Sequence, residues 1–79
     1  MSDIQNIVFK TVADTAKVEI SAISGETRLT EDLKLKSVDK ISISAVLSSQ
    51  LGVSISMFDI LKVKSVAELI ALAESKVKK

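Results

Sequence analysis

The sequence predicts an all-α fold: a four-helix bundle with a long first loop and a short third helix. Apolar residues recur at spacings of three and four near both ends of the chain, as they do in amphipathic helices. In the middle, residues 37–51 contain neither Gly nor Pro and are followed by Gly52, a residue suited to a left-handed helix end. The chain has 79 residues, of which 47% are apolar, so we expect residues 1–79 to form a single domain around one core.

The first helix is expected to begin at Ser2, because Ser2 and Gln5 have the spacing of a capping box. Its apolar stripe reaches roughly to Lys17 and consists of Ile4, Ile7, Val8 and Val12, widened by Phe9 and Ala16. The pattern then ends. Residues 18–30 are expected to form a long ordered loop with its apolar side chains turned inward, namely Ile20, Ile23 and Leu29, followed by Leu33.

The predicted second helix, residues 37–51, carries two apolar faces when its residues are placed at steps of about 100°. The narrower face consists of Val38, Ile41 and Ala45, and the broader face of Ile43, Val46, Leu47 and Leu51. Because a surface helix buries one face, we expect the broader face in the core and the narrower face in contact with partners. Ordinary core packing of the narrower face is the alternative. High β-branched content also leaves a strand over residues 41–46 as a local competitor.

The last part of the chain predicts a short helix and a longer one. The apolar stretch of residues 57–61 allows no more than a turn or two of helix. The final helix is expected to begin at Ser65, which forms a second capping-box pattern with Glu68. Its apolar residues recur at helical spacing, namely Val66, Leu69, Ile70 and Ala73.

The composition excludes several functions. Without Cys or His, the chain can form neither a Ser-His or Cys-His nucleophile nor a His-containing zinc site, and we expect no catalytic and no metal residues. Phe9 and Phe58 are the only aromatic residues and the net charge is +1, which argues against a nucleic-acid partner. No basic leader or long apolar run occurs, so we expect a cytoplasmic monomer without a membrane partner.

Charge is uneven along the chain. The segment between Leu33 and Lys64 contains two aspartates and five lysines, which are Lys34, Lys36, Lys40, Lys62 and Lys64. Surface lysines are usually no more than solvated side chains. The alternative is an electropositive rim that attracts phosphate or an acidic partner.

Ser37 is the candidate functional residue. It stands at the predicted start of the second helix, within Asp32-Leu33-Lys34-Leu35-Lys36-Ser37-Val38-Asp39. Taken alone, a Ser in this place is typical of a helix N-cap. This segment and the apolar positions after it resemble the acyl carrier protein family, whose attachment motif runs Asp-x-Gly-x-Asp-Ser-Leu at the head of the second helix. The resemblance extends from the first helix to Ala73.

The resemblance implies an acyl-carrier-like bundle on which a phosphopantetheinyl transferase places a 4′-phosphopantetheine arm, taken from coenzyme A, at Ser37. The arm then holds acyl groups as thioesters for acyl-transferring or condensing enzymes of fatty-acid, polyketide or related biosynthesis. Residues expected to contact these partners are Lys36, Val38, Asp39, Ile41 and Ala45. A long acyl chain is expected to enter the bundle beside Ile43, Val46, Leu47 and Ile70.

The chain also departs from the family's pattern. Lysines replace the motif's Gly and second Asp, at Lys34 and Lys36, and Val38 replaces its Leu. Typical carriers have an acidic second helix that docks on basic patches of partner enzymes, whereas here residues 38–51 contain one Asp and one Lys as their only charges. Partner choice by charge must therefore differ. The alternative function is an unmodified carrier-like module that binds protein partners through this helix.

Overall fold

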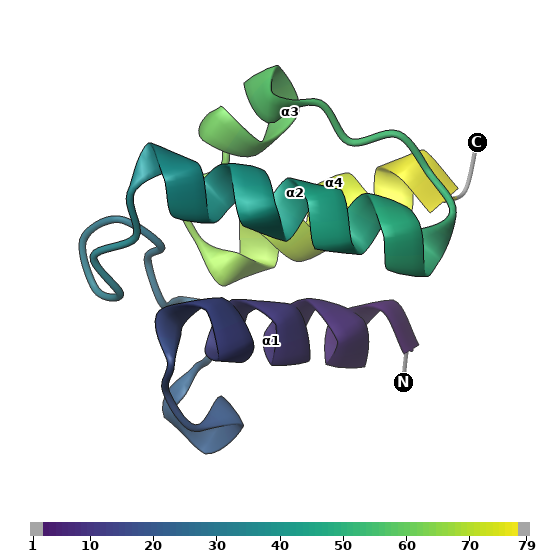
Figure 1. Ribbon diagram of the computed structural model, residues 1–79. Coiled ribbons are helices and arrows are strands. Elements are labelled where there is room, and N and C mark those ends of the chain that lie inside the picture. The colour runs from purple at the N-terminus through teal and green to yellow at the C-terminus, as the bar shows by residue number, and fades with distance from the viewer. Residues whose placement is uncertain (1–2, 78–79) are drawn as a thin grey trace.

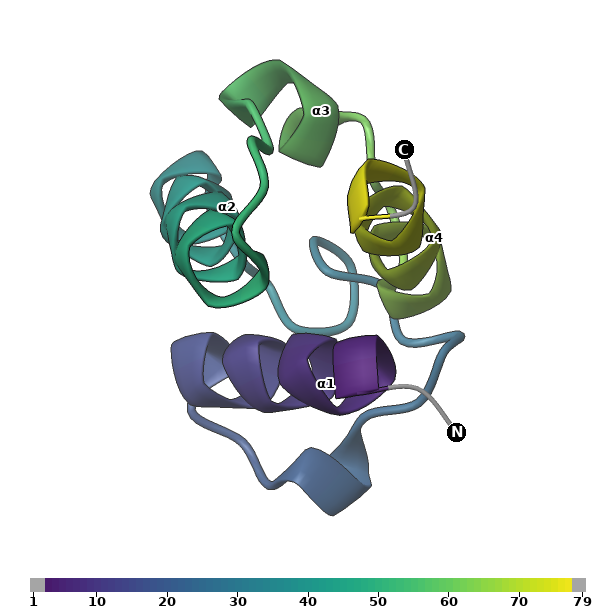
Figure 2. The ribbon, with the colours of Figure 1, turned by 90° about the vertical axis from the view of Figure 1, so that its right-hand side faces the viewer.

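The computed structural model describes residues 3–77 and confirms the predicted all-α bundle (Figures 1 and 2). The elements are α1 (Asp3–Ala16), the 3-10 helix η1 (Ile20–Ala22), α2 (Ser37–Leu51), α3 (Met57–Leu61) and α4 (Val66–Val77). Both α2 and α4 pack against α1, and α3 packs against α2. In both views α1 and α3 lie on opposite sides of α2 and α4. Within residues 3–77, no helix combines the length and the apolar character needed to cross a membrane.

The core is aliphatic, and all four α-helices and the first loop contribute to it. Its largest fully buried side chains are Leu29, Ile43, Leu47, Ile60 and Leu69, with Val8, Val12 and Val66. Burial of Ile43 and Leu47 holds α2 in helical form although β-branched residues lower its intrinsic helix propensity. The strand alternative for residues 41–46 is therefore wrong.

Helix α1 buries the stripe that the sequence predicts. Val8 and Val12 are fully buried, while Ile4 and Ile7 are partly buried at its N-terminal end. The predicted capping box at Ser2 lies outside the described residues. The helix ends at Ala16, one residue before the predicted end.

Backbone hydrogen bonds hold the long first loop against the segment that leads into α4. The N–H of Leu29 donates to the Lys64 carbonyl (3.0 Å), and the N–H of Val66 donates to the Thr27 carbonyl (3.0 Å). These bonds hold Leu29 in the core, as predicted. Ile23 is also buried and Leu33 is partly buried.

Ile20 is 50% exposed, so its predicted inward placement is wrong. The physical reason is η1, which begins at Ile20 and in which no residue is buried. Ile23, just after η1, turns inward instead.

Helix α2 has the predicted bounds, and Gly52 ends it in the left-handed conformation (φ 66°, ψ 34°). Ile43 and Leu47 of the broader face are fully buried and Leu51 is partly buried. Val46 is 40% exposed, so its assignment to the core is wrong. It borders a cleft between α2 and α1 instead of packing beneath α2.

Helices α3 and α4 begin with side-chain caps. At α3, Asp59 N–H donates to Ser56 Oγ (3.1 Å) and Ser56 N–H donates to Asp59 Oδ2 (3.3 Å), a complete capping box that the sequence analysis did not identify. At α4, Glu68 N–H donates to Ser65 Oγ (3.3 Å), as predicted. The returning bond to Glu68 Oε1 comes from the Lys64 N–H (3.0 Å).

Candidate functional site

Ser37 is the first residue of α2, and its side chain is exposed. The N-cap is Lys36, whose backbone is extended (φ −94°, ψ 172°), so the interpretation of Ser37 as an N-cap is wrong. Within the described part of the chain, the Ser37 hydroxyl has no hydrogen-bond partner. A reagent can therefore reach this oxygen from solvent without breaking a contact.

The first turn of α2 keeps unpaired backbone donors beside Ser37. Asp39 Oδ2 accepts a hydrogen bond from the Lys36 N–H (3.0 Å). The reciprocal bond of a capping box is missing, because the Lys36 ammonium only donates. The first backbone bond runs from the Lys40 N–H to the Lys36 carbonyl (3.0 Å), and the N–H groups of residues 37–39 have no acceptor among the described residues. They give this helix end a partial positive charge.

The turn before α2 fixes the position of the helix start. Leu35 is buried, and its N–H donates to the Leu29 carbonyl (3.0 Å). Asp32 Oδ2 accepts from the Arg28 N–H (2.8 Å) and closes the preceding turn. Lys34 lies between them with φ 56°, in the left-handed region that favours glycine. Lys34 stands at the glycine position of the resembled motif, and here a lysine adopts a conformation that glycine adopts without strain.

The five residues predicted to contact partners are the N-cap and four of the first nine residues of α2. Val38 is 71% exposed, Ile41 is 38% exposed and Ala45 is also exposed, at a spacing that aligns them on one face. Lys36 is exposed, whereas Asp39 is half-buried and its carboxylate is engaged at the helix start. The predicted exposure of the narrower face is confirmed, and its contact with partners stays a prediction.

Helix α3 exposes three apolar residues that the sequence analysis missed. Phe58 is 72% exposed, Met57 is 45% exposed and Leu61 is 41% exposed. α3 packs against α2 and lies beside the N-terminal half of that helix, which begins at Ser37 (Figure 1). The spacing of residues in this segment indicates their exposure. A helix this short buries one side, which here is that of Ile60. Phe58 is two residues earlier and therefore lies on the opposite side.

Carboxylates near Ser37 are engaged within the protein, whereas the lysines are not. The ion pairs among residues 3–77 join Arg28 to Glu31 (3.3 Å) and Lys76 to Asp59 (3.1 Å). The hydrogen bond from the Lys76 ammonium and, after it, the backbone N–H of Ser56 lower the pKa of Asp59. The lysines of the predicted basic rim take part in no ion pair in this part of the chain, namely Lys34, Lys36, Lys40, Lys62 and Lys64.

A hollow of about 300 Å³ opens one helical turn after Ser37. It joins the first loop, α2 and the end of α3, since its lining includes Arg28, Glu31, Lys40, Leu61 and Lys64. Two of the five lysines therefore border the same depression. Leu61, one of the exposed apolar residues of α3, borders this depression with them.

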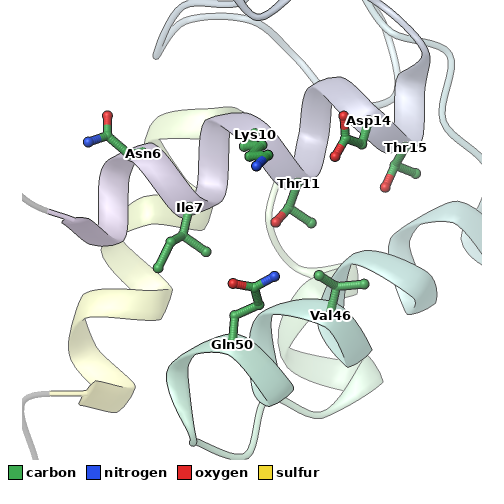
Figure 3. A pocket seen from close by; sticks show the side chains of 8 residues that line it. All are labelled: Asn6, Ile7, Lys10, Thr11, Asp14, Thr15, Val46 and Gln50. Carbon is green, nitrogen blue, oxygen red and sulfur yellow. The ribbon is translucent and has the colours of Figure 1, made fainter.

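A cleft between α1 and α2 lies away from Ser37 (Figure 3). Its volume is about 280 Å³, and α2 contributes Val46 and Gln50 to its lining. At about 1.5 Å per residue, Val46 is roughly 14 Å from Ser37 along the helix axis. The other residues expected beside an acyl chain are buried in the core, namely Ile43, Leu47 and Ile70. An acyl chain can lie beside them only by displacing packed side chains.

Two comparisons with known proteins bear on this site. A model of the family described as "Phosphopantetheine attachment site" matches residues 6–73. The match covers nearly all of α1, the first loop, α2 and α3, and includes Ser37. The sequence has no match among curated proteins.

Proposed function

The chain belongs to the family of phosphopantetheine attachment domains, and we propose that Ser37 is the residue that carries the 4′-phosphopantetheine arm. Domains of this family are sites of covalent attachment of this arm, and they are carriers rather than catalysts. The observation that carries the proposal is the exposed Ser37 hydroxyl, which has no partner within the described residues, at the start of α2.

The residues around Ser37 fit a phosphodiester at its hydroxyl. The unpaired N–H groups of the first turn and the helix dipole favour negative charge at this end of α2. Lys36 and Lys40 add positive charge on either side of Ser37 along the chain. These groups would hold the diester, and the arm supplies the terminal thiol that this chain lacks, because it contains no Cys.

Attachment is a transfer from coenzyme A catalysed by a phosphopantetheinyl transferase. Ser37 Oγ forms a bond to the phosphorus that carries the pantetheine, the bond from that phosphorus to the adenosine bisphosphate portion breaks, and the hydroxyl proton passes to the transferase. The loaded chain then presents acyl groups as thioesters to acyl-transferring or condensing enzymes of fatty-acid, polyketide or related biosynthesis. The replacements at Lys34, Lys36 and Val38 favour a specialised carrier over a housekeeping one.

The test is incubation with coenzyme A and a broadly specific transferase, followed by intact mass measurement and titration of free thiols. Because the chain contains no Cys, each thiol reports one attached arm. We expect one arm per chain and none in Ser37→Ala. Ser49→Ala, which removes another exposed serine of the same helix, is the matched control and should gain one arm.

Two results would contradict the proposal. An arm that is still gained by Ser37→Ala would place the attachment at another hydroxyl. A folded chain that gains no arm from any of several transferases would support the alternative, an unmodified module that binds protein partners through α2.

A further inference from the structure

We propose that the surface formed by the start of α2 and by α3 docks on partner enzymes that present carboxylates around an apolar depression. The charges of docking are then the reverse of those used by carriers with an acidic second helix. The inference rests on the proposed carrier function, since the partners are enzymes that act at Ser37. We call this surface the basic docking face, and define it by the lysines at positions 34, 36, 40, 62 and 64 with Val38 and Phe58.

The apolar part of the basic docking face is too exposed to serve the fold. Val38 and Phe58 have the largest exposed fractions among the exposed large apolar residues, 71% and 72%. They come from two helices that pack against each other. Exposed apolar residues that gather on one surface and are rimmed by charge mark interaction sites. Contact with an apolar depression on a partner would remove both side chains from water.

The chain's own carboxylates balance only part of the positive charge of the face. Asp39 accepts from the Lys36 backbone N–H (3.0 Å) and keeps its negative charge there, whereas Asp59 is paired with Lys76 on α4 (3.1 Å), outside the face. No lysine of the face takes part in an ion pair within residues 3–77. The face therefore attracts carboxylates on an approaching protein and speeds encounter with it.

Two of the lysines stand where the local backbone disfavours them. Lys34 has φ 56°, a conformation in which a side chain is strained and glycine is not. Lys36 is the N-cap, where a side-chain acceptor would satisfy a backbone N–H and where the helix dipole repels a cation. Neither lysine side chain stabilises the fold. What the two positions share is a positive charge beside Ser37.

The composition of the face favours an acidic protein over other anionic partners. Its charges are all ammonium groups, and the only arginine of the chain, Arg28, is paired with Glu31 (3.3 Å). Single-stranded nucleic acids are bound largely by aromatic side chains on which successive bases stack, and Phe58 is the only aromatic residue of the face. Lysines interspersed with apolar side chains suit a partner whose carboxylates surround an apolar depression.

The test uses a defined probe: a helical peptide with leucines on one face and glutamates on the other, matched by a peptide with lysines in place of the glutamates. Each is titrated to millimolar concentration into the full ¹⁵N-labelled chain, with and without the arm. We expect the acidic peptide to shift amides of residues 34–41 and 57–64, more strongly at low salt, and the basic peptide to shift none of them.

Charge reversal then tests the lysines themselves. The double variant Lys36→Glu with Lys40→Glu should bind the acidic peptide about tenfold more weakly. The control, Lys10→Glu with Lys17→Glu, changes the net charge equally, at Lys10 in α1 and at Lys17, the residue that follows α1. α1 lies on the side of the bundle away from α3 (Figures 1 and 2), so this variant should bind as before. Circular dichroism checks that both variants are folded.

The inference is wrong if the acidic peptide shifts no residue of the face, or if the α1 control loses as much affinity as the double variant. It is also wrong if duplex DNA or vesicles containing phosphatidylserine bind the face more tightly than the acidic peptide does. Intact mass after treatment with coenzyme A and transferase separates the two proposals. If the chain gains its arm but does not bind the acidic peptide, only the docking face is contradicted. If it binds the peptide but gains no arm, only the carrier function is contradicted.

Discussion

The backbone N–H of Lys36 donates to the carboxylate of Asp39 (3.0 Å), but the Lys36 side chain cannot accept a bond in return. The start of α2 is therefore half of a capping box. The start of α3 has both halves, between Ser56 and Asp59 (3.1 and 3.3 Å). The same chain thus contains a complete and an incomplete capping box, and Ser37 lies between the two residues of the incomplete one, Lys36 and Asp39.

Completing the box should stabilise the chain. Lys36→Ser supplies a hydroxyl that can accept from the Asp39 N–H, and we expect the free energy of unfolding to rise by about 1 kcal/mol. Asp39→Ala removes the existing half and should lower it by about 1 kcal/mol. Urea denaturation measures both. Lys36→Ala is the control, because it removes the cation without adding an acceptor; a gain equal to that of Lys36→Ser would show that charge, and not capping, limits the stability of this helix end.

The left-handed backbone of Lys34 makes a second prediction. Glycine adopts φ 56° without strain, so Lys34→Gly should raise the free energy of unfolding by about 1 kcal/mol even though glycine gains entropy in the unfolded chain. Lys62→Gly is the matched control, since Lys62 has φ −81° and glycine there should be destabilising. Thermal and urea unfolding of the two variants give the comparison. Destabilisation by both substitutions would contradict the assigned conformation of Lys34.

The helical spacing of apolar residues predicts the fully buried core of this protein better than the exposure of residues at the margin of the core. The stripe of α1 and the bounds of α2 follow from the spacing of apolar residues and from Gly52. Val46 and Ile20 were assigned inward and are 40% and 50% exposed. Periodicity places residues on faces of a helix, but how far a neighbouring helix covers a face depends on tertiary packing, which no local pattern contains.

The sequence likewise predicts some features of the candidate site and not others. The motif around Ser37 locates the hydroxyl, and the exposure of Val38 follows from the helical spacing of α2. The N-cap was misplaced by one residue, because the backbone angles of Lys36 decide where the helix begins. The contribution of Phe58 was missed. Its exposure follows from its two-residue spacing to Ile60, but its position next to α2 depends on the packing of α3, which residues distant in the sequence determine.

The link between α4 and α3 should depend on pH. The Lys76 ammonium lies 3.1 Å from Asp59 and, together with the Ser56 N–H, lowers the pKa of Asp59 in the folded chain. Because this pKa is lower in the folded than in the unfolded state, the pair stabilises the fold above the unfolded pKa. That stabilisation is lost as the pH falls through the folded pKa.

Lys76→Gln should therefore raise the pKa of Asp59 toward its ordinary value and reduce the part of the acid destabilisation that comes from this carboxylate. A ¹³C NMR titration of the Asp59 carboxyl group measures the change. Lys10→Gln removes a lysine from α1 and should leave the Asp59 titration as it is. If Asp59 titrates identically in Lys76→Gln and in the parent chain, the hydrogen bond from Ser56 alone holds the carboxylate.

Phe58 and Ile60 lie on opposite sides of α3, and substitutions at the two positions should separate folding from docking. Ile60 is fully buried, so Ile60→Ala should lower the free energy of unfolding by about 3 kcal/mol through lost burial and the cavity left behind.

Phe58 is 72% exposed, so Phe58→Ser should change the free energy of unfolding by less than about 0.5 kcal/mol and yet weaken binding of the acidic peptide. Urea denaturation and the amide titration measure the two effects on the same samples. A loss of stability in Phe58→Ser comparable with that in Ile60→Ala would mean that Phe58 packs against the bundle in solution. Phe58 would then be unavailable to a partner, and Val38 would be the only apolar side chain left on the basic docking face.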